Sequence, residues 1–404
     1  MKKLTLFILI ILFSTIICTA NSSAFDVDEM DDFPNTRLGS ENFDIFVYGS
    51  KLNNDFILLN NVVNYALNHL IGKANKNQIV DKKKLDHFLE VLSAYYNSNI
   101  APKMNPYHNV YHAADVVHTL YLFLINSKYY NPTLFKDTYD RQINEIPNNI
   151  KYNDLDIFAL IIAAACHDYK HRGRSNNFYL NYKKKVPFAK ELEPFSYKLE
   201  KYHFVEAQKL IEEYDLLEYL NKYQKERFYK IMEMVILATD NSLNAKHAEM
   251  MMAYKEIIQL KSIVTIQDII NLNTRLFMKE QSSKVEYPNL SIDEIKLLEF
   301  EWFLHAADIS NAAKKKDIFL AWSFRINEEI CFESIEINSF DETKDINCIG
   351  DDEDKFRKSQ LQFFENIIEV FFRPLCEVFD YLNYLCFNYD KNKAMLEGKE
   401  KIFN

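Results

Sequence analysis

The chain has 404 residues, of which 48% are hydrophobic, and it contains only six glycines and nine prolines. This content supports a large buried core, argues against intrinsic disorder and favours long helices over turn-rich β architectures. The formal net charge of −10 argues against nucleic acid as a partner, because nucleic-acid binding requires a basic surface.

Residues 1–24 have the pattern of a signal peptide or signal anchor. Lys2 and Lys3 precede an apolar run from Leu4 to Cys18, and small residues follow it. The run has about 15 residues, fewer than the roughly 20 of a membrane-spanning helix, although the next residues could extend it. An acidic linker at residues 25–41 follows. Lysines before the run and acids after it place the following domain outside the cytoplasm by the positive-inside rule.

Residues 42–404 are predicted to form one continuous helical domain. The segment from Leu155 to Cys166 is too apolar for a surface helix, and with Asn153 or Asp154 as its N-cap it predicts a central buried helix. Hydrophobic spacing predicts further helices at Glu200 to Tyr214, Lys225 to Ala238, Leu297 to Ala307 and Gln360 to Phe372, the last stopped near Pro374. Surface loops are expected at Lys128 to Tyr152 and at Asn338 to Lys355.

The six cysteines are Cys18, Cys166, Cys331, Cys348, Cys376 and Cys386. No two of them form a CxxC pair, and their spacing predicts neither a zinc cage nor a small disulfide framework. Cys166 lies in an apolar run and is expected to be a packed thiol.

The histidines are placed in a pattern that suggests metal chemistry. His108 and His112 are four residues apart, as are His167 and His171, and on a helix this spacing puts both members of a pair on one face. One such pair is more often structural than functional. Asp168, however, follows His167 at the end of the buried run, where unpaired polar groups are costly. Such ligands suit zinc, magnesium or manganese, and a bridging aspartate suits two metals that activate water and clamp a phosphoryl group.

Four segments then resemble one family. Tyr107 to Val116, YHNVYHAADV, resembles the YHNxxHAxDV motif of the class I 3′,5′-cyclic nucleotide phosphodiesterases. His167 to Phe178 fits the HDxxHxGxxNxF signature of that family at every fixed position, and His305 to Asn311 and Lys358 to Phe363 resemble its later blocks. The resemblance covers residues 43 to 388. It implies an all-α fold, the compact multi-helix catalytic domain of the HD-type metal phosphohydrolase superfamily.

The resemblance also implies an activity. His112, His167, Asp168 and Asp308 would ligate a tightly held zinc, and Asp168 would bridge to a second metal, magnesium or manganese. A hydroxide between the metals would attack phosphorus in line, and His108 would act as general acid on the departing ribose oxygen. The product of a 3′,5′-cyclic nucleotide, cAMP or cGMP, would be the 5′-nucleoside monophosphate.

Further residues match supporting positions of the family. His171, Glu200 and Thr239 would hold metal-bound waters, although Glu200 alone would be an ordinary surface carboxylate. The expected substrate-binding residues are Tyr107, Asn311, Ile326, Gln360 and Phe363. The amide of Gln360 would bond the purine edge, with Phe363 and Ile326 on the two ring faces. Because an amide can present its donor or its acceptor, both purines remain allowed.

Two segments depart from the family pattern. The stretch from Asp240 to His247 is a few residues longer than the usual Met-x-x-His, and an acidic stretch between Ile330 and Ser359 replaces the usual Ser-Pro-x-x-Asp. This second segment lies beside the substrate pocket in relatives, so the nucleotide preference does not carry over.

Two other functions compete with cyclic nucleotide hydrolysis. A helical metal phosphohydrolase acting on nucleotide monophosphates or oligonucleotides would share the His and Asp ligands but would not need Gln360 and Phe363. A non-enzymatic nucleotide receptor would have a broken ligand set, whereas this one is intact. The expected partners are the cyclic nucleotide and a membrane, not nucleic acid, and a homodimer stays open. Membrane attachment through the N-terminal segment is favoured, with a secreted or lumenal location after signal cleavage as the alternative.

Overall fold

The computed structural model describes residues 37–52, 54–96, 105–127, 152–260, 292–398 and 401–402. Within these ranges no strand is present, which confirms the predicted all-α class. The first helices are α2 (Ile45–Lys51), α3 (Phe56–Leu70), α4 (Lys73–Ile79), α5 (Lys82–Tyr96), α6 (Val110–Asn126) and α7 (Asp154–Cys166). The middle of the chain forms α8 (Asn176–Tyr182), α9 (Ala189–Leu192), η3 (Glu193–Phe195), α10 (Leu199–Glu213), α11 (Lys222–Leu237), η4 (Asn241–Leu243) and α12 (Asn244–Leu260).

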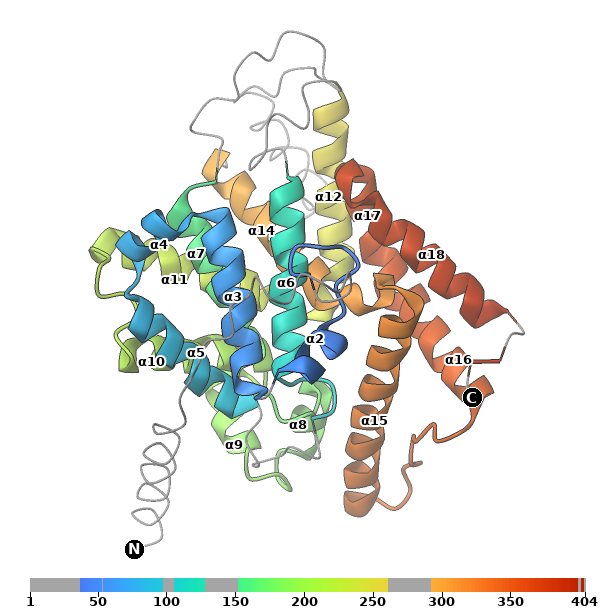
Figure 1. The fold of residues 1–404 in the computed structure, drawn as a ribbon. Coiled ribbons are helices and arrows are strands. Elements are labelled where there is room, and N and C mark those ends of the chain that lie inside the picture. The colour runs from blue at the N-terminus through green and yellow to red at the C-terminus, as the bar shows by residue number, and fades with distance from the viewer. Residues whose placement is uncertain are drawn as a thin grey trace, which may run out of the picture.

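The C-terminal part begins with α14 and continues through the longest helix, α15, to the end of the described chain. Its elements are α14 (Ile292–Asp308), η5 (Ser310–Ala313), α15 (Lys316–Phe340), α16 (Glu353–Phe363), the π-helix η6 (Phe364–Ile368), α17 (Glu369–Val378), η7 (Asp380–Leu382) and α18 (Asn383–Glu397). In Figure 1 α15 to α18, in orange and red, occupy one side of the molecule and the blue α3 to α5 occupy the other, whereas α14 packs against α6 and α11 between them.

Helix α7 lies at the centre of the core, as its sequence predicts. Asn153 is its N-cap and accepts from the backbone N–H of Asp156 at 2.8 Å, and its residues 156–166 are all buried. It packs against α3, α6 and α11, so apolar side chains are needed on every face. Its C-terminal end therefore delivers the next residues, His167 and Asp168, into the interior.

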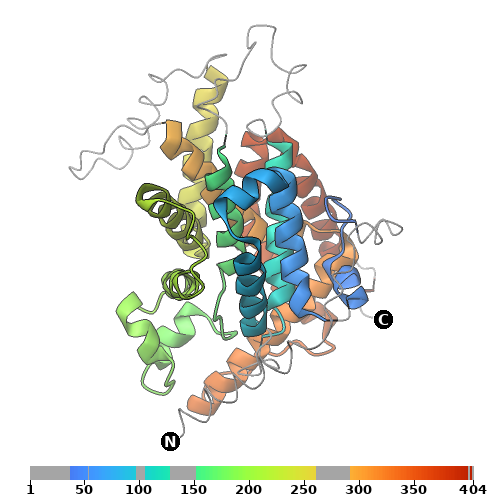
Figure 2. The same cartoon turned by 60° about the vertical axis from the view of Figure 1, so that its left-hand side comes forward.

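A second, smaller core lies under α8 and α9. Phe178, Phe188 and Tyr202 are buried in it, and Ile337 and Phe340 from the end of α15 pack against it. The view turned by 60° shows the light-green α8 and α9 and the orange end of α15 together at the lower end of the molecule (Figure 2). Apolar contacts thus hold the end of α15 next to the segment that follows the His167 turn.

The predicted stop at Pro374 is wrong. The chain remains helical from α16 through the π-helix η6 and α17, and Pro374 lies inside α17. A proline removes one helical hydrogen bond. Here Phe371, Phe372 and Leu375 are fully buried on the same helix, and their burial offsets that loss.

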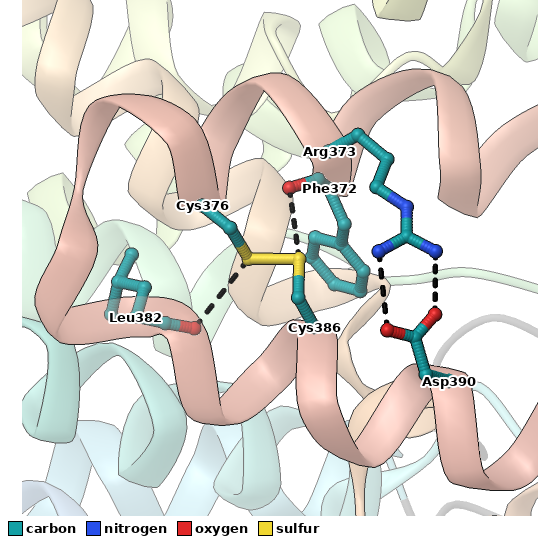
Figure 3. The surroundings of a disulfide bond; sticks show 6 residues. All are labelled: Phe372, Arg373, Cys376, Leu382, Cys386 and Asp390. Atoms are coloured by element: carbon teal, nitrogen blue, oxygen red, sulfur yellow. Dashed lines mark hydrogen bonds and ion pairs between the residues drawn. A yellow bond between two sulfur atoms is a disulfide. The ribbon is translucent and has the colours of Figure 1, made fainter.

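Two disulfide bonds lie in the C-terminal part, although the cysteine spacing predicts no such framework. Cys331 of α15 is bonded to Cys348, and Cys376 of α17 is bonded to Cys386 of α18. Figure 3 shows the second bond beside the ion pair of Arg373 and Asp390. Spacing along the chain could not predict these pairs, because the turn between α17 and α18 is what brings Cα atoms of Cys376 and Cys386 to 6.5 Å. Cys166 is free and buried, as predicted.

The other predicted helices are confirmed with ends that differ by a few residues, as α10, α11 and α14. The predicted loop from Asn338 begins three residues later, because α15 continues to Phe340. Residues 1–36, with the predicted signal segment and most of the acidic linker, lie outside the described residues, as does most of the loop predicted at Lys128 to Tyr152. Among the described helices, none combines the length and the apolar character needed to cross a membrane.

Candidate metal centre

Three helix ends converge on the predicted ligands. Asn109 is the N-cap of α6, accepting from the backbone N–H of Tyr111 at 2.9 Å, and this places His112 in the first turn. His167 is the C-cap of α7 and Asp168 follows it, whereas Asp308 is the last residue of α14. Helix ends are suited to such a site, because they combine a rigid support with a side chain at the boundary of the core.

The four predicted ligands form one compact cluster. His112 Nε2 lies 3.0 Å from Asp308 Oδ1 and 3.4 Å from Asp168 Oδ2. His167 Nε2 lies 3.1 Å from Asp168 Oδ2 and 3.3 Å from Asp308 Oδ1. One ligand atom from each residue falls within 4.8 Å of all the others. The structure thus brings together all four residues that the resemblance assigns to the tight metal.

The protonation of His167 tests whether this cluster fits a cation. Its Nδ1 donates to the carbonyl oxygen of Ala164 at 2.8 Å, so Nε2 is the ring nitrogen that faces the carboxylates of Asp168 and Asp308. Burial alone would lower the pKa of His167, but these carboxylates raise it well above its usual range, so Nε2 carries a proton when no cation is bound. Within the described residues, the buried Oδ2 of Asp168 has no hydrogen-bond partner. A divalent cation would displace the Nε2 proton of His167 and pair with that carboxylate oxygen, because a metal binds the deprotonated imidazole. The two imidazoles and two carboxylates therefore fit a divalent cation such as a protein tetrahedral site holds.

The carboxylates of this cluster are ionised. Burial alone would raise the pKa of Asp308, but the neighbouring His167 and His112 hold it well below its usual range. Burial would likewise raise the pKa of Asp168, and His167 and His108 lower it well below its usual range. The cluster therefore has two negative charges available to a cation at neutral pH.

His108, the predicted general acid, lies beside the cluster and not on the same helix as His112. His108 precedes the N-cap Asn109, so the prediction that His108 and His112 share one helix face is wrong. The same prediction is wrong for His167 and His171, because α7 ends at its C-cap His167 and His171 follows in the turn. His108 Nδ1 pairs with Oε1 of the buried Glu329 from α15. Burial alone would lower the pKa of His108, but the carboxylates of Glu329 and Asp168 raise it to about 9.

His171 joins the two turns of the site. Its ring stacks on that of His108 with 3.8 Å between centroids, and the backbone N–H of Gly173 donates to its Nδ1 at 3.0 Å. The side-chain amide of Asn105 donates to the carbonyl oxygen of His171 at 2.7 Å. His108, Asp168 and His171 form a second group whose ligand atoms lie within 4.8 Å, adjoining the first through Asp168.

Glu200 and Thr239 lie further out. The amide of Asn176 donates to both oxygens of Glu200 at 3.1 Å, and the hydroxyl of Thr239 donates to the carbonyl of Ile236. Neither side chain bonds directly to one of the four ligands within the described part of the chain. Asp240, next to Thr239, caps the short helix η4. Asp240 also pairs with Lys198, which lies two residues before Glu200.

The predicted substrate residues lie on four elements. Tyr107 is buried and packs on His112 and Trp322, with 4.6 Å and 5.3 Å between ring centroids. Asn311 lies in η5, and its buried Oδ1 has no hydrogen-bond partner among the described residues. Gln360 is buried on α16, and the half-buried Phe363 ends that helix.

A hydrogen bond connects the two helices that carry the predicted base clamp. Ser359 Oγ donates to Asn327 Oδ1 at 3.2 Å, and Asn327 Nδ2 donates to the carbonyl of Ser323 at 2.7 Å. Ser359 precedes Gln360 and Asn327 follows Ile326, so α15 and α16 meet where the clamp is expected. The disulfide from Cys331 to Cys348 connects the same helix α15 to the segment before α16.

Two residues of the site escaped the sequence analysis. Glu329 pairs with His108 and also accepts from the backbone N–H of Tyr107 and of His108, each at 3.2 Å. His203 of α10 is buried, donates from Nδ1 to the carbonyl of Tyr169 at 2.7 Å, and has Nε2 4.0 Å from Asp168 Oδ1. A survey of all ten histidines would have found His203, three residues after Glu200, whereas Glu329 gives no local signal.

Comparisons with known proteins agree with this geometry. The sequence profile of the family described as 3′,5′-cyclic nucleotide phosphodiesterase matches residues 107–388. Over 227 residues the chain is 27% identical to the probable 3′,5′-cyclic-AMP phosphodiesterase pde-4 of Caenorhabditis elegans. This match covers 56% of this chain and 27% of that protein. Over 246 residues it is 28% identical to the mouse dual specificity calcium/calmodulin-dependent 3′,5′-cyclic nucleotide phosphodiesterase 1C, covering 60% of this chain and 26% of that protein.

The chain thus spans about a quarter of the length of these curated relatives. Among solved structures, the fold resembles the phosphodiesterase domain of the RhoPDE fusion protein from the choanoflagellate Salpingoeca rosetta. The TM-score is 0.64 at 21% identity, and the match covers 92% of this chain and 97% of that one. At this identity the likeness establishes the fold alone. The profile match, which spans the metal cluster and extends through α15 to α18, establishes that the chain belongs to the 3′,5′-cyclic nucleotide phosphodiesterase family.

Proposed function

We propose that this protein hydrolyses 3′,5′-cyclic nucleotides, cAMP or cGMP, to 5′-nucleoside monophosphates. The observation that carries the proposal is the buried cluster of His112, His167, Asp168 and Asp308 with His108 held beside it. Relatives that the chain resembles carry names describing cyclic-AMP or dual-specificity cyclic nucleotide hydrolysis. An intact ligand set favours an enzyme over a receptor that only binds nucleotides.

The residues divide the chemistry between them. Two divalent cations, Zn²⁺ held by the four ligands and Mg²⁺ or Mn²⁺ beside Asp168, would supply an activated water and neutralise the phosphoryl charge. His108 holds a proton for the departing ribose oxygen, because the Glu329 carboxylate stabilises its protonated form. The alkoxide leaving group needs this proton, since it is a strong base.

His171, Glu200 and Thr239 act in this proposal on the waters around the cations. His171 is neutral in the site, since burial and the nearby His108 hold its pKa well below the usual range. Burial raises the pKa of Glu200, and the amide of Asn176 orients its carboxylate. Such groups tune the ligands they surround, and their removal costs about 10–100-fold in affinity or activity.

The base would lie between α15 and α16. Gln360 offers one amide donor and one acceptor to the purine edge, Phe363 and Ile326 cover the ring faces, and the side chains of Asn311 and Tyr107 complete the wall. The hydrogen bond of Ser359 to Asn327 supports this arrangement, because it fixes α16 against α15 beside Gln360. Both purines suit such an amide, so the proposal includes both cyclic nucleotides.

We also propose that the catalytic domain faces an oxidising compartment and is attached to a membrane through the apolar run at Leu4 to Cys18. Two disulfides support this, because such bonds persist outside the reducing cytosol. Secretion or a lumenal location after cleavage is the alternative. Protease protection on intact cells distinguishes the sides: digestion of the domain without permeabilisation places it outside, and full protection overturns that placement.

Steady-state assays with cAMP and with cGMP, each with and without a chelator, test the activity. We expect turnover of at least one substrate that chelation abolishes and added Zn²⁺ with Mg²⁺ restores. A parallel panel of nucleotide monophosphates and short oligonucleotides separates the competing phosphohydrolase. Turnover of that panel with none of either cyclic nucleotide would overturn the proposal.

A further inference from the structure

Helix α15 presents three carboxylates on one face toward the metal site. Glu329, Glu333 and Glu336 are spaced by four and three residues, which places them one above another along a helix. Glu329 pairs with His108, as described above. Glu333 and Glu336 lie further along the helix and pair with other groups.

Glu333 and Glu336 contact the turn that follows the metal ligand Asp168. Glu333 Oε2 accepts from the backbone N–H of Ser175 at 2.6 Å, and its Oε1 accepts from the Ser175 hydroxyl at 2.9 Å. Glu336 Oε2 accepts from Nε of the buried Arg174 at 2.8 Å. Glu333 thus makes two hydrogen bonds to one residue, whereas Glu336 holds Arg174 by an ion pair.

The turn between Asp168 and Ser175 needs such an anchor. Lys170 and Gly173 have φ values of 67° and 64°, in the left-handed region that non-glycine residues adopt at a cost. Inside the turn, the backbone N–H of His171 donates to the carbonyl of Asp168 at 2.9 Å. Ser175 closes the turn and also caps α8, since its hydroxyl accepts from the backbone N–H of Phe178.

The two turns anchored by α15 meet in the active site. Glu329 holds the turn of Tyr107 and His108, and Glu333, one helical turn further, holds the turn that carries His171. The rings of His108 and His171 stack at 3.8 Å. The amide of Asn105 spans the same junction, donating to the carbonyl oxygens of His171 at 2.7 Å and of His108 at 3.3 Å.

We propose that Glu333 is a positioning residue for catalysis: by fixing Ser175 to α15, it sets the place of His171 against the general acid His108. This inference rests on the proposed phosphodiesterase function. Glu333 touches neither the cluster ligands nor His108 by any described contact, so its effect passes through the backbone of the His171 turn. A rigid helix that holds both turns keeps their spacing constant while substrate enters and product leaves.

The test compares Glu333→Ala with the near-isosteric Glu333→Gln. Glu328→Ala is the matched control, because Glu328 lies on the exposed face of the same helix. We expect Glu333→Ala to lower kcat about tenfold with KM for cAMP or cGMP within twofold of wild type, as for residues that orient metal-site groups. Glu333→Gln keeps one acceptor for the Ser175 N–H, so it should recover most of kcat. Glu328→Ala should match wild type.

A second readout does not depend on turnover. The ring resonances of His108 and His171, recorded with ¹³C-labelled histidine, report the stacking, and they should move in Glu333→Ala while zinc content and Tm stay close to the control. If wild type hydrolyses neither cyclic nucleotide, the proposed function fails, and the resonances still decide the positioning role. Unchanged kcat and unchanged resonances in Glu333→Ala overturn the inference. A loss of kcat that follows a loss of zinc or of fold overturns it as well, and so do resonances that move equally in Glu333→Ala and Glu333→Gln.

Discussion

The metal half of the molecule, where the ends of α6, α7 and α14 meet, has no disulfide among its described residues, whereas the half from α15 to α18 has two. The metal half places its ligands with a buried apolar helix, α7, whose end brings Nε2 of His167 to 3.1 Å from Oδ2 of Asp168. The segment at residues 341–352, by contrast, is rich in acidic residues and buries little apolar surface.

The difference shows how each half of the molecule is stabilised. Apolar burial is strong around α7, so that half can bury two imidazoles and two carboxylates whose burial alone is unfavourable. The charged segment at residues 341–352 buries too little apolar surface to offset the conformational entropy that it loses on folding. The disulfide from Cys331 to Cys348 reduces this loss, because it limits the conformational entropy of the unfolded chain. The comparison predicts that a chelator acts on one half and a reductant on the other.

The largest effect is expected from breaking the metal half at its bridging ligand. Asp168→Asn removes one charge and one ligand from the cluster, so we expect loss of bound cation and a fall in turnover of at least about a thousandfold. Metal content by mass spectrometry and cyclic nucleotide assays measure both. Asp317→Asn, at an exposed position in the first turn of α15, is the control. Wild-type activity in Asp168→Asn would show that the cluster is not the active centre.

A smaller effect is expected when the ligands stay and the proton donor is removed. His108→Ala should lower kcat about a hundredfold or more, the usual contribution of a general acid such as we propose for His108, with the content of bound metal unchanged. His87→Ala serves as the control, because His87 is an exposed histidine outside the cluster, paired with Glu90 at 3.7 Å and packed on the ring of Tyr214. Full activity in His108→Ala would remove His108 from the mechanism, and loss of bound metal would make it a ligand.

The C-terminal half is tested by removing each disulfide separately. The double variants Cys331→Ser with Cys348→Ser and Cys376→Ser with Cys386→Ser open loops with sequence separations of 17 and 10. Loop-closure entropy predicts a loss of about 3 kcal/mol in unfolding free energy for each. Urea unfolding measures this loss.

The two variants should differ in substrate binding. Only the first disulfide connects α15 to the segment before Gln360, so its removal should raise KM several-fold through lost preorganisation, with zinc retained. Removal of the second should leave KM unchanged. Equal KM values in both variants would mean that the first disulfide does not support the substrate site.

Sequence patterns predicted the metal half better than the C-terminal half. The long apolar run of α7 and the matches around His112, His167 and Asp308 identified the centre, because a run too apolar for a surface has few alternatives. The helix-face argument for His108 and His112 failed for a local reason. Asn109 caps α6 through its own side chain, so the helix begins after His108.

In the C-terminal half, tertiary contacts decide what the sequence leaves open. Glu328 and Glu329 are adjacent and chemically identical, and only the docking of α15 buries one against His108 and exposes the other. The same holds for the cysteines, whose pairing depends on how α17 turns into α18. Pro374 predicts a helix end by its own chemistry, and the buried side chains around it override that preference.

The smallest effect is expected at the junction of the two halves, where Glu329 of α15 pairs with His108. In the cation-free protein the pKa of His108 is raised to about 9, so this pair stabilises the fold fully below about pH 6.5 and loses that contribution as pH rises through about 9. Glu329→Gln removes the main raising charge, while burial continues to lower the pKa. The NMR titration midpoint of His108 should therefore fall, and unfolding free energy should vary less between pH 6.5 and 9. Cations at the cluster should lower the midpoint of wild type as well, because like charges repel. Glu328→Gln is the control, and an equal midpoint in wild type and Glu329→Gln would show that α15 does not set the charge of the general acid.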